Sequence, residues 1–363
     1  MVRQAHHERD ASVGFKLKKL TNFNQILAES IVMQATHQRA VTLARIPIGQ
    51  PVPTDFAISS IPIADLADGF VRVKAQYFSL DPFLRGVLSG RHMGHRCEIG
   101  STVPGFMAGV VVESRDADYA QGDWVVGIGG WQEFAQLKKP RKLNRRVPMS
   151  TGLGVLGMPG LTAWAGIHDI ARPLADETVV ISAAAGPVGS TAGQFAKALG
   201  ALVVGIAGGP EKCAQVVKTF GFDACVDYKQ EGFAVALRAA CPNGINVYFD
   251  NVGGAVLEAC ILQLALNARV VLCGLMDQYN QAERPKGPNL GPVIGARAML
   301  KGLVVYDYYP RFSEFSAFAE PLVHSGAIKV LEDIAHGIEA TPEAFCRLMR
   351  GQNVGKALVK LIQ

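Results

Sequence analysis

The sequence predicts a two-domain α/β protein, in which a doubly wound parallel sheet is joined to a β-rich domain. Two observations lead to this prediction. Residues 38–150 hold short β-branched runs separated by Gly and Pro, and "FVRVKAQYFSL" alternates as a half-buried strand does. From about residue 155 to 320 the pattern becomes a repeated strand, glycine turn and helix, which is typical of a parallel sheet covered by helices. A chain of 363 residues is long enough for two separate cores.

The domain boundaries follow from these changes of pattern. Residues 1–32 are polar and basic with only a brief apolar patch, and we interpret them as a disordered extension. We assign residues 33–154 to the β-rich domain and residues 155–317 to the parallel-sheet domain. The final "ALVKLI" alternates again, so residues 318–363 are expected to complete the β-rich domain.

The parallel-sheet domain is expected to contain six strands, with helices between them. The helical segments include "EKCAQVVKTFG" and "AVLEACILQLAL". The expected strands are Thr178–Ser182, Leu202–Ile206, Ala224–Asp227, Val247–Asp250, Arg269–Cys273 and Gly302–Tyr306.

Composition narrows the classes of protein. The net charge of +5 is modest and the basic residues are scattered, so nucleic acid is not an expected partner. Mean hydropathy is +0.19, yet no apolar run approaches the roughly 18 residues that a membrane span needs. The seven cysteines form no CxxC motif and no secretory segment is evident, which favours reduced thiols in the cytoplasm.

The segment "VVISAAAGPVGSTAGQFAKALGALVVGIAGG", residues 179–209, predicts a dinucleotide site. Gly186 and Gly189 allow the backbone to approach a pyrophosphate, with Pro187 and Val188 between them. The helix that starts near Ser190 would direct its N-terminal amides at the phosphates. A glycine turn alone is weak evidence, but here it lies between a strand and a helix, as this type of site requires.

The end of the second strand of this unit predicts which dinucleotide binds. An NAD site places an acidic residue there to hold the ribose 2′-hydroxyl. This chain has "AGGP" followed by Glu211 and Lys212, so the strand ends without an acid and a lysine follows. That combination suits a 2′-phosphate and predicts NADPH/NADP+ as the cofactor. The alternative is that Lys212 is an ordinary solvated charge at the start of a helix.

Six ordered motifs give the chain a resemblance to a known family. They are "SLDPFLRG" (79–86), "MPGLTAW" (158–164), "AAAGPVGSTAGQ" (183–194), "FDNVGG" (249–254), "CGLMDQYN" (273–280) and "NVGKALVK" (353–360). From about residue 36 to its end, the chain resembles the zinc-independent medium-chain dehydrogenase/reductases. Among these it is most similar to the NADPH-dependent alkenal/one oxidoreductases, which include prostaglandin and leukotriene B4 reductases and curcumin reductases. The resemblance implies a GroES-like catalytic domain, a central Rossmann domain with the active site between them, and a homodimer.

The resemblance also implies roles for particular residues. The glycine turn would meet the pyrophosphate, and Lys212 and Tyr228 would hold the 2′-phosphate end. The residues implied near the ribose and nicotinamide are Met158, Thr162, Asn251, Cys273, Gly274, Tyr279 and Asn353.

No metal is expected. Where zinc-dependent relatives carry Gly-His-Glu, this chain reads "GFMAG" (105–109), and neither Phe106 nor Met107 can ligate zinc. The segment "RHMGHRC" offers His92, His95 and Cys97, which we interpret as surface or as the lining of a substrate pocket rather than as a metal site.

Without a metal to polarise a simple ketone, an enone or enal is the easier substrate, because charge delocalises into an enolate that hydrogen-bond donors can stabilise. Tyr279 is the candidate donor, and the alternative is a tyrosine ring packed at the cleft. The family commonly has Asp-Pro-Tyr where this chain has Phe83, so Phe83, His92 and His95 are tentative pocket residues. Two alternative functions remain: a quinone oxidoreductase, and a non-catalytic NADPH-binding protein.

Overall fold

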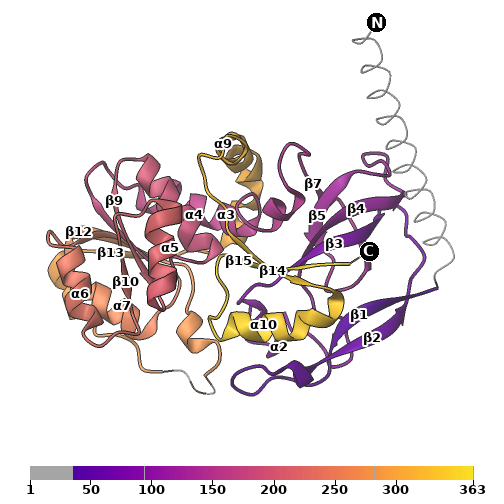
Figure 1. Cartoon of the computed structure of the whole chain (residues 1–363), viewed down its shortest axis with the longest axis horizontal. Coiled ribbons are helices and arrows are strands. Elements are labelled where there is room, and N and C mark those ends of the chain that lie inside the picture. Colours follow the sequence, from indigo (N-terminus) through magenta and orange to yellow (C-terminus); the bar gives the residue numbers. More distant parts are fainter. Residues whose placement is uncertain (1–35, 94, 282, 284, 363) are drawn as a thin grey trace, which may run out of the picture.

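The computed structural model describes residues 36–93, 95–281, 283 and 285–362. The extension predicted at residues 1–32 lies outside them. The chain forms two cores that lie side by side, with the last strands of the chain returning to the first core (Figure 1). Within the described part of the chain, no helix is long and apolar enough to cross a membrane.

The first core is β-rich. Its main sheet has the strand order β14-β15-β3-β4-β5-β7, with β6 paired to β3, and a separate hairpin pairs β1 with β2. The strands are β1 (His37–Leu43), β2 (Phe56–Pro62), β3 (Val71–Ser79), β4 (Phe106–Ser114), β5 (Trp124–Ile128), β6 (Phe134–Leu137), β7 (Arg141–Lys142), β14 (Glu332–His336) and β15 (Lys356–Lys360). The short helices are η1 (Pro53–Asp55), α2 (Leu84–Leu88), η2 (Met149–Leu153), η6 (Ile338–Ala340) and α10 (Thr341–Met349).

The second core is built on a parallel sheet with the order β10-β9-β8-β11-β12-β13. Since β8 comes first in the chain, this is the doubly wound 3-2-1-4-5-6 order of the Rossmann fold. The strands are β8 (Thr178–Ser182), β9 (Leu202–Ala207), β10 (Ala224–Asp227), β11 (Ile245–Asp250), β12 (Leu264–Leu272) and β13 (Met299–Gly302).

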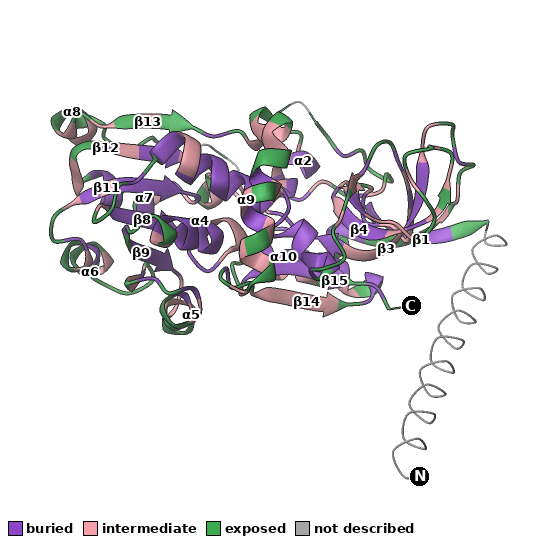
Figure 2. Ribbon diagram, turned by 90° about the horizontal axis from the view of Figure 1, so that it is seen from above, coloured by how far each residue is buried: buried purple, intermediate pink, exposed green. Residues whose placement is uncertain are grey.

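Helices cover both faces of this sheet; the central strands β8 and β11 are buried between them, whereas the edge strand β13 is largely exposed (Figure 2). The helical segments are α3 (Met158–Trp164), η3 (Ala165–Ala171), α4 (Pro187–Ala198), α5 (Pro210–Phe220), α6 (Phe233–Ala240), α7 (Gly254–Ile261), η4 (Met276–Gln278), α8 (Gly291–Ala296), η5 (Val305–Arg311) and α9 (Phe312–His324).

The predicted fold class is confirmed, and two predicted elements are wrong. The sixth strand is β13, Met299–Gly302, and most of the predicted strand at Gly302–Tyr306 instead leads into the 3₁₀ helix η5. The helix expected through "AVLEACILQLAL" ends at Ile261, because Leu264 already pairs with Ile245 in the sheet.

Candidate active site between the two cores

The glycine turn lies where the strand order of the Rossmann sheet reverses, between β8 and β11. Gly186 caps α4, whose first residue is Pro187. A Cβ at Gly189 would lie 2.4 Å from the carbonyl oxygen of Ala183, so only glycine fits there. The backbone N–H of Gly355 donates to the carbonyl oxygen of Ala185 over 3.0 Å. The "NVGK" segment therefore lies directly beside the turn.

Two lysines and a tyrosine meet at the end of β9. Tyr228 and Lys229 follow β10, and a Cβ on Gly208 would lie about 3 Å from both side chains, at 2.9 and 3.0 Å. Lys212, on the first turn of α5, donates to the carbonyl oxygen of Gly351 over 2.5 Å. Burial lowers the pKa of Lys212, and repulsion from Lys229 lowers it further. An anion bound between the two ammonium groups would remove that repulsion.

The carboxyl ends of β11 and β12 bring a second set of predicted residues together. The side-chain amide of Asn251 donates to the carbonyl oxygen of Ser182, and the backbone N–H groups of Cys273 and Gly274 both donate to the carbonyl oxygen of Asp250. The Tyr279 hydroxyl lies 3.4 Å from the place of a Cβ on Gly274.

Tyr279 and two further predicted residues form hydrogen bonds with nearby backbone groups. Burial raises the pKa of the Tyr279 phenol, while a hydrogen bond from the Leu275 backbone partly offsets the rise. The Asn353 amide donates to the carbonyl oxygen of Gly355 over 2.9 Å, and the Thr162 hydroxyl donates to that of Met158 over 2.8 Å.

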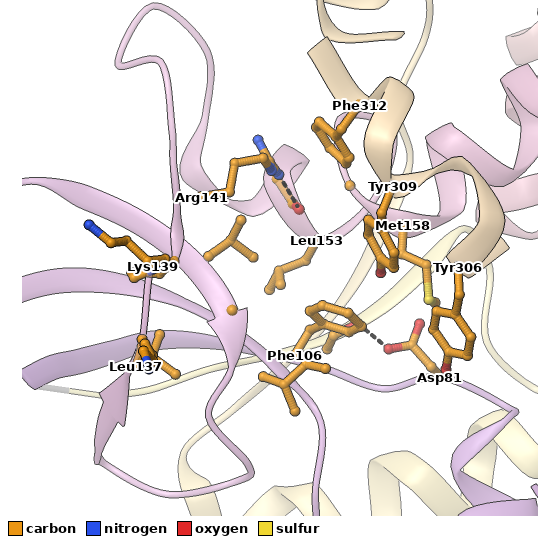
Figure 3. A pocket seen from close by; sticks show the side chains of 18 of the residues that line it. Asp81, Phe106, Leu137, Lys139, Arg141, Leu153, Met158, Tyr306, Tyr309 and Phe312 are labelled. Atoms are coloured by element: carbon orange, nitrogen blue, oxygen red, sulfur yellow. Dashed lines mark hydrogen bonds between the residues drawn. The ribbon is translucent and has the colours of Figure 1, made fainter. Parts of the chain in front are cut away.

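A pocket of about 700 Å³ opens between the two cores, and Figure 3 shows its lining. Its walls are largely apolar, with Phe106 on β4, Leu153 on η2, Met158 on α3 and Phe312 at the start of α9. Tyr306 and Tyr309 enter it from η5 (Figure 3). Met158 is a predicted cofactor residue, whereas Tyr279 is not among the residues that line this pocket.

Lys138 and Lys139 line the pocket, and so do two less exposed charged groups, Asp81 and Arg141. Asp81 forms a buried ion pair with Lys356, with 2.6 Å between Oδ1 and Nζ, and it also accepts a hydrogen bond from Ser79 over 2.5 Å. Arg141 stacks over the ring of Phe312 at 4.4 Å and donates to two backbone carbonyl oxygens. Burial lowers the pKa of Arg141 to about 10.

Of the tentative pocket residues, Phe83 and His92 contact each other, whereas His95 is exposed. The His92 ring lies 5.1 Å from the Phe83 ring, and its Nε2 lies 3.3 Å from the Tyr306 hydroxyl. His92 therefore borders the pocket through Tyr306. Burial lowers the pKa of His92, with a smaller contribution from His95. His95 is exposed, and Cys97 is buried with its thiol turned toward backbone carbonyls.

No group of three or more His, Cys, Asp or Glu side chains within residues 36–93, 95–281, 283 and 285–362 is arranged to hold a metal ion.

A Rossmann sheet with a glycine turn, facing a β-rich domain across an apolar pocket, defines a two-domain dehydrogenase/reductase fold. Comparisons with known proteins agree with this class. Residues 39–145 match a family model described as the N-terminal domain of oxidoreductase, and residues 187–322 match one described as zinc-binding dehydrogenase.

Two curated relatives and one crystal structure define the family more closely. The chain is 39% identical to NADPH-dependent curcumin reductase of Escherichia coli, over 90% of this chain and 98% of that protein. It is 37% identical to the NADP(+)-dependent 2-alkenal reductase of Nicotiana tabacum, over 88% and 96%. CurA from Vibrio vulnificus, crystallised with NADPH, matches with a TM-score of 0.85 at 37% identity, over 90% and 99%. The chain therefore belongs to the alkenal/one oxidoreductase family of the medium-chain dehydrogenase/reductases.

Four polar residues of the site were not among the predicted ones. Lys229 could have been found, because it follows Tyr228 directly at the end of a predicted strand. Arg141, Tyr306 and Tyr309 carry no comparable signal, since "VYDYYP" resembles a continuation of the preceding strand and Arg141 lies in a run of basic residues.

Proposed function

We propose that the protein is an NADPH-dependent reductase of the C=C bond of α,β-unsaturated ketones and aldehydes. The observation that carries the proposal is the combination of the glycine turn, the lysine pair Lys212 and Lys229 near the end of β9, and an apolar pocket that tyrosine side chains enter. The names of the relatives support it, because curcumin and 2-alkenals both contain a C=C bond conjugated to a carbonyl group.

The residues of the cleft fit NADPH. The amides at the start of α4 would hold the pyrophosphate, which the glycine backbone allows to approach. Lys212 and Lys229 would bind the 2′-phosphate, with Tyr228 beside it. Asn251 and Tyr279, at the carboxyl ends of the sheet, would approach the nicotinamide half together with Thr162 and Asn353.

The pocket is suited to a conjugated carbonyl compound. Bound NADPH supplies a hydride, which adds to the β-carbon of the substrate. The apolar walls contributed by Phe106, Leu153 and Met158 suit the carbon chain of such a substrate. An unpaired negative charge is costly in such surroundings, so the substrate oxygen needs a hydrogen-bond donor.

We propose Tyr279 as one such donor. Its phenol stays protonated near neutral pH because burial raises its pKa. Tyr279→Phe keeps the ring and removes the hydroxyl, so it should lower kcat on enones by about 10²–10³-fold while NADPH affinity changes only a few-fold. Stopped-flow turnover and fluorescence titration with NADPH measure the two effects. Unchanged turnover would leave Tyr279 a packing residue, and a loss confined to NADPH binding would make it a cofactor ligand.

The assay that tests the function is NADPH oxidation with a panel of 2-alkenals, enones, a diarylheptanoid and quinones, with identification of each product. The proposal requires the saturated carbonyl compound as product. Hydroquinone formation without C=C reduction would favour the quinone oxidoreductase instead. Binding of NADPH with no turnover on any compound would favour the non-catalytic alternative.

The homodimer and the cytoplasmic location stay predictions. Strand β13 is an edge of the Rossmann sheet, and Met299 on it and Ile294 beside it on α8 are exposed apolar side chains. We expect this edge to be the contact surface of a dimer.

A further inference from the structure

The helix η5 turns one face of aromatic side chains into the pocket. In a 3₁₀ helix, side chains three residues apart lie one above the other. Tyr306 and Tyr309 follow this spacing, and their rings stack with centroids 6.0 Å apart and planes 18° apart. Phe312, three residues further on, continues the stack at 6.4 Å from Tyr309. The geometry of η5 therefore fixes the position of the Tyr309 ring in the pocket wall.

The hydroxyl of Tyr309 differs from those of its neighbours. The Tyr306 hydroxyl is paired with His92, and the Tyr308 hydroxyl donates to the Asp169 carboxylate over 2.9 Å. The Tyr309 hydroxyl is buried and has no hydrogen-bond partner among the residues that the structure describes. It points into the pocket between Met158 and Phe106 (Figure 3). Leaving a buried hydroxyl unpaired costs about 1–3 kcal/mol, so the protein carries this cost in the absence of a ligand.

Burial, together with neighbouring charges, keeps the Tyr309 phenol protonated. Burial raises the pKa of this phenol to about 12, and the neighbouring Tyr306 and Asp81 raise it while Arg141 opposes the rise. Because a phenol with this pKa is neutral near pH 7, Tyr309 offers a hydrogen-bond donor. Among the described residues no acceptor lies within hydrogen-bond distance of its hydroxyl, and the Asp81 carboxylate binds Lys356 and Ser79 instead.

We propose that the Tyr309 hydroxyl donates a hydrogen bond to the carbonyl oxygen of the substrate, whose conjugated chain would lie against Met158 and Phe106. This inference rests on the proposed function and adds a catalytic residue to it. Tyr309 keeps its proton throughout and stabilises the negative charge that develops on the oxygen. The α-carbon then takes its proton from solvent. Tyr279 approaches the cleft from the end of η4 and Tyr309 from η5, and an enolate oxygen can accept two hydrogen bonds.

A pair of matched variants separates catalysis from structure. Tyr309→Phe removes a hydroxyl without a protein partner, so kcat on an enone should fall at least tenfold while the unfolding temperature stays the same or rises. Tyr308→Phe, in the same helix, breaks the hydrogen bond to Asp169, so it should lower the unfolding temperature and leave kcat within twofold. Tyr309→Phe should therefore lose turnover and keep its thermal stability, whereas Tyr308→Phe should lose thermal stability and keep its turnover.

Binding gives a readout that does not depend on turnover. A saturated ketone that fills the apolar pocket cannot be reduced at a C=C bond, and calorimetry should show its affinity for the NADPH-loaded protein reduced at least fivefold in Tyr309→Phe. The inference is overturned if Tyr309→Phe keeps both its turnover and this affinity, or if its activity loss is accompanied by a lower unfolding temperature. Neither result touches the proposed function, which fails only if the wild-type protein reduces no enone or enal.

Discussion

We propose that the positive charges of Lys212 and Lys229 decide which dinucleotide the cleft accepts. Strand β9 ends at Ala207 without an acidic residue. The ammonium group of Lys229 lies near enough to Lys212 to lower the pKa of Lys212 by repulsion. In an NAD site, a carboxylate at that place would accept hydrogen bonds from the ribose. Here we expect the two positive charges to bind an anion, which the 2′-phosphate would supply.

Replacing Lys212 tests this interpretation. A hydrogen bond to a charged group typically contributes about 1.5–3 kcal/mol, so Lys212→Ala should weaken NADPH binding roughly 10- to 150-fold and change NADH binding little. Fluorescence titration with each dinucleotide measures both affinities. Lys218→Ala is the matched control, because Lys218 is an exposed lysine in the last turn of the same helix. Equal losses of affinity for NADPH and NADH would show that Lys212 does not bind the 2′-phosphate.

At this scale, the sequence predicts residues that belong to local patterns. The glycine turn and Lys212 follow from their distance to a strand end, and Tyr228 follows from the family resemblance. The unpaired hydroxyl of Tyr309 could not be predicted, because it depends on how η5 packs against the β-rich domain. Tyr308 and Tyr309 look alike in the sequence, and only the folded chain gives one of them a carboxylate partner.

Helix α4 lies close to the sheet because of its glycines. A Cβ on Gly193 would lie 1.9 Å from Cζ of Phe222, whose ring is buried. The helix can pack against the segment between α5 and β10 only if this position has no side chain. Val188, Ala192 and Phe195 form the apolar face that packs into the second core.

The contact predicts a reversal of the usual preference for alanine in a helix. Alanine is about 1 kcal/mol more favourable than glycine within a helix, yet Gly193→Ala should lower the free energy of unfolding by about 1–3 kcal/mol because it overpacks the core. Gly295→Ala in α8 is the control, since nothing lies within 4 Å of a Cβ there, and it should be neutral or slightly stabilising. Urea unfolding compares the two variants. A stabilised Gly193→Ala protein would mean that the Phe222 ring moves aside freely.

Elements were predictable from the sequence where they are short, apolar and bounded by turns. Strands β8 and β10 match their predicted residues. The sixth strand was misplaced because its position is set by its partner: β13 pairs with residues 269–272 of β12 and stops where that strand stops. The β-branched and aromatic residues after Gly302 favour a strand locally, but the tertiary contacts of η5 outweigh that preference.

The C-terminal segment of the chain joins the main sheet of the β-rich domain. Strand β15 pairs with β3 in antiparallel register, which places the C-terminal segment inside the N-terminal core (Figure 1). Lys356 on β15 and Asp81 just after β3 then form their ion pair with both side chains nearly inaccessible to solvent, 3% and 4% exposed. The alternation in "ALVKLI" predicted the return of this segment. The ion pair joins residues far apart in the chain, so no local sequence pattern predicts it.

Breaking this ion pair should destabilise the whole molecule. Lys356→Met leaves the Asp81 carboxylate buried with only the Ser79 hydroxyl as a partner, and an uncompensated buried charge typically costs about 3–5 kcal/mol. Lys360→Met, at the exposed end of the same strand, is the matched control and should change the free energy of unfolding by about 0.5 kcal/mol or less.

Urea unfolding of both variants measures the difference, and Lys356→Met combined with Asp81→Asn should recover part of the loss because the buried charge is then absent. If Lys356→Met were as stable as Lys360→Met, the ion pair would not hold the C-terminal strand in place. Asp81 also lines the pocket. Lys356→Met should therefore also raise the KM for the enone, because the ion pair that joins the C-terminal strand to the β-rich domain also fixes one wall of the pocket.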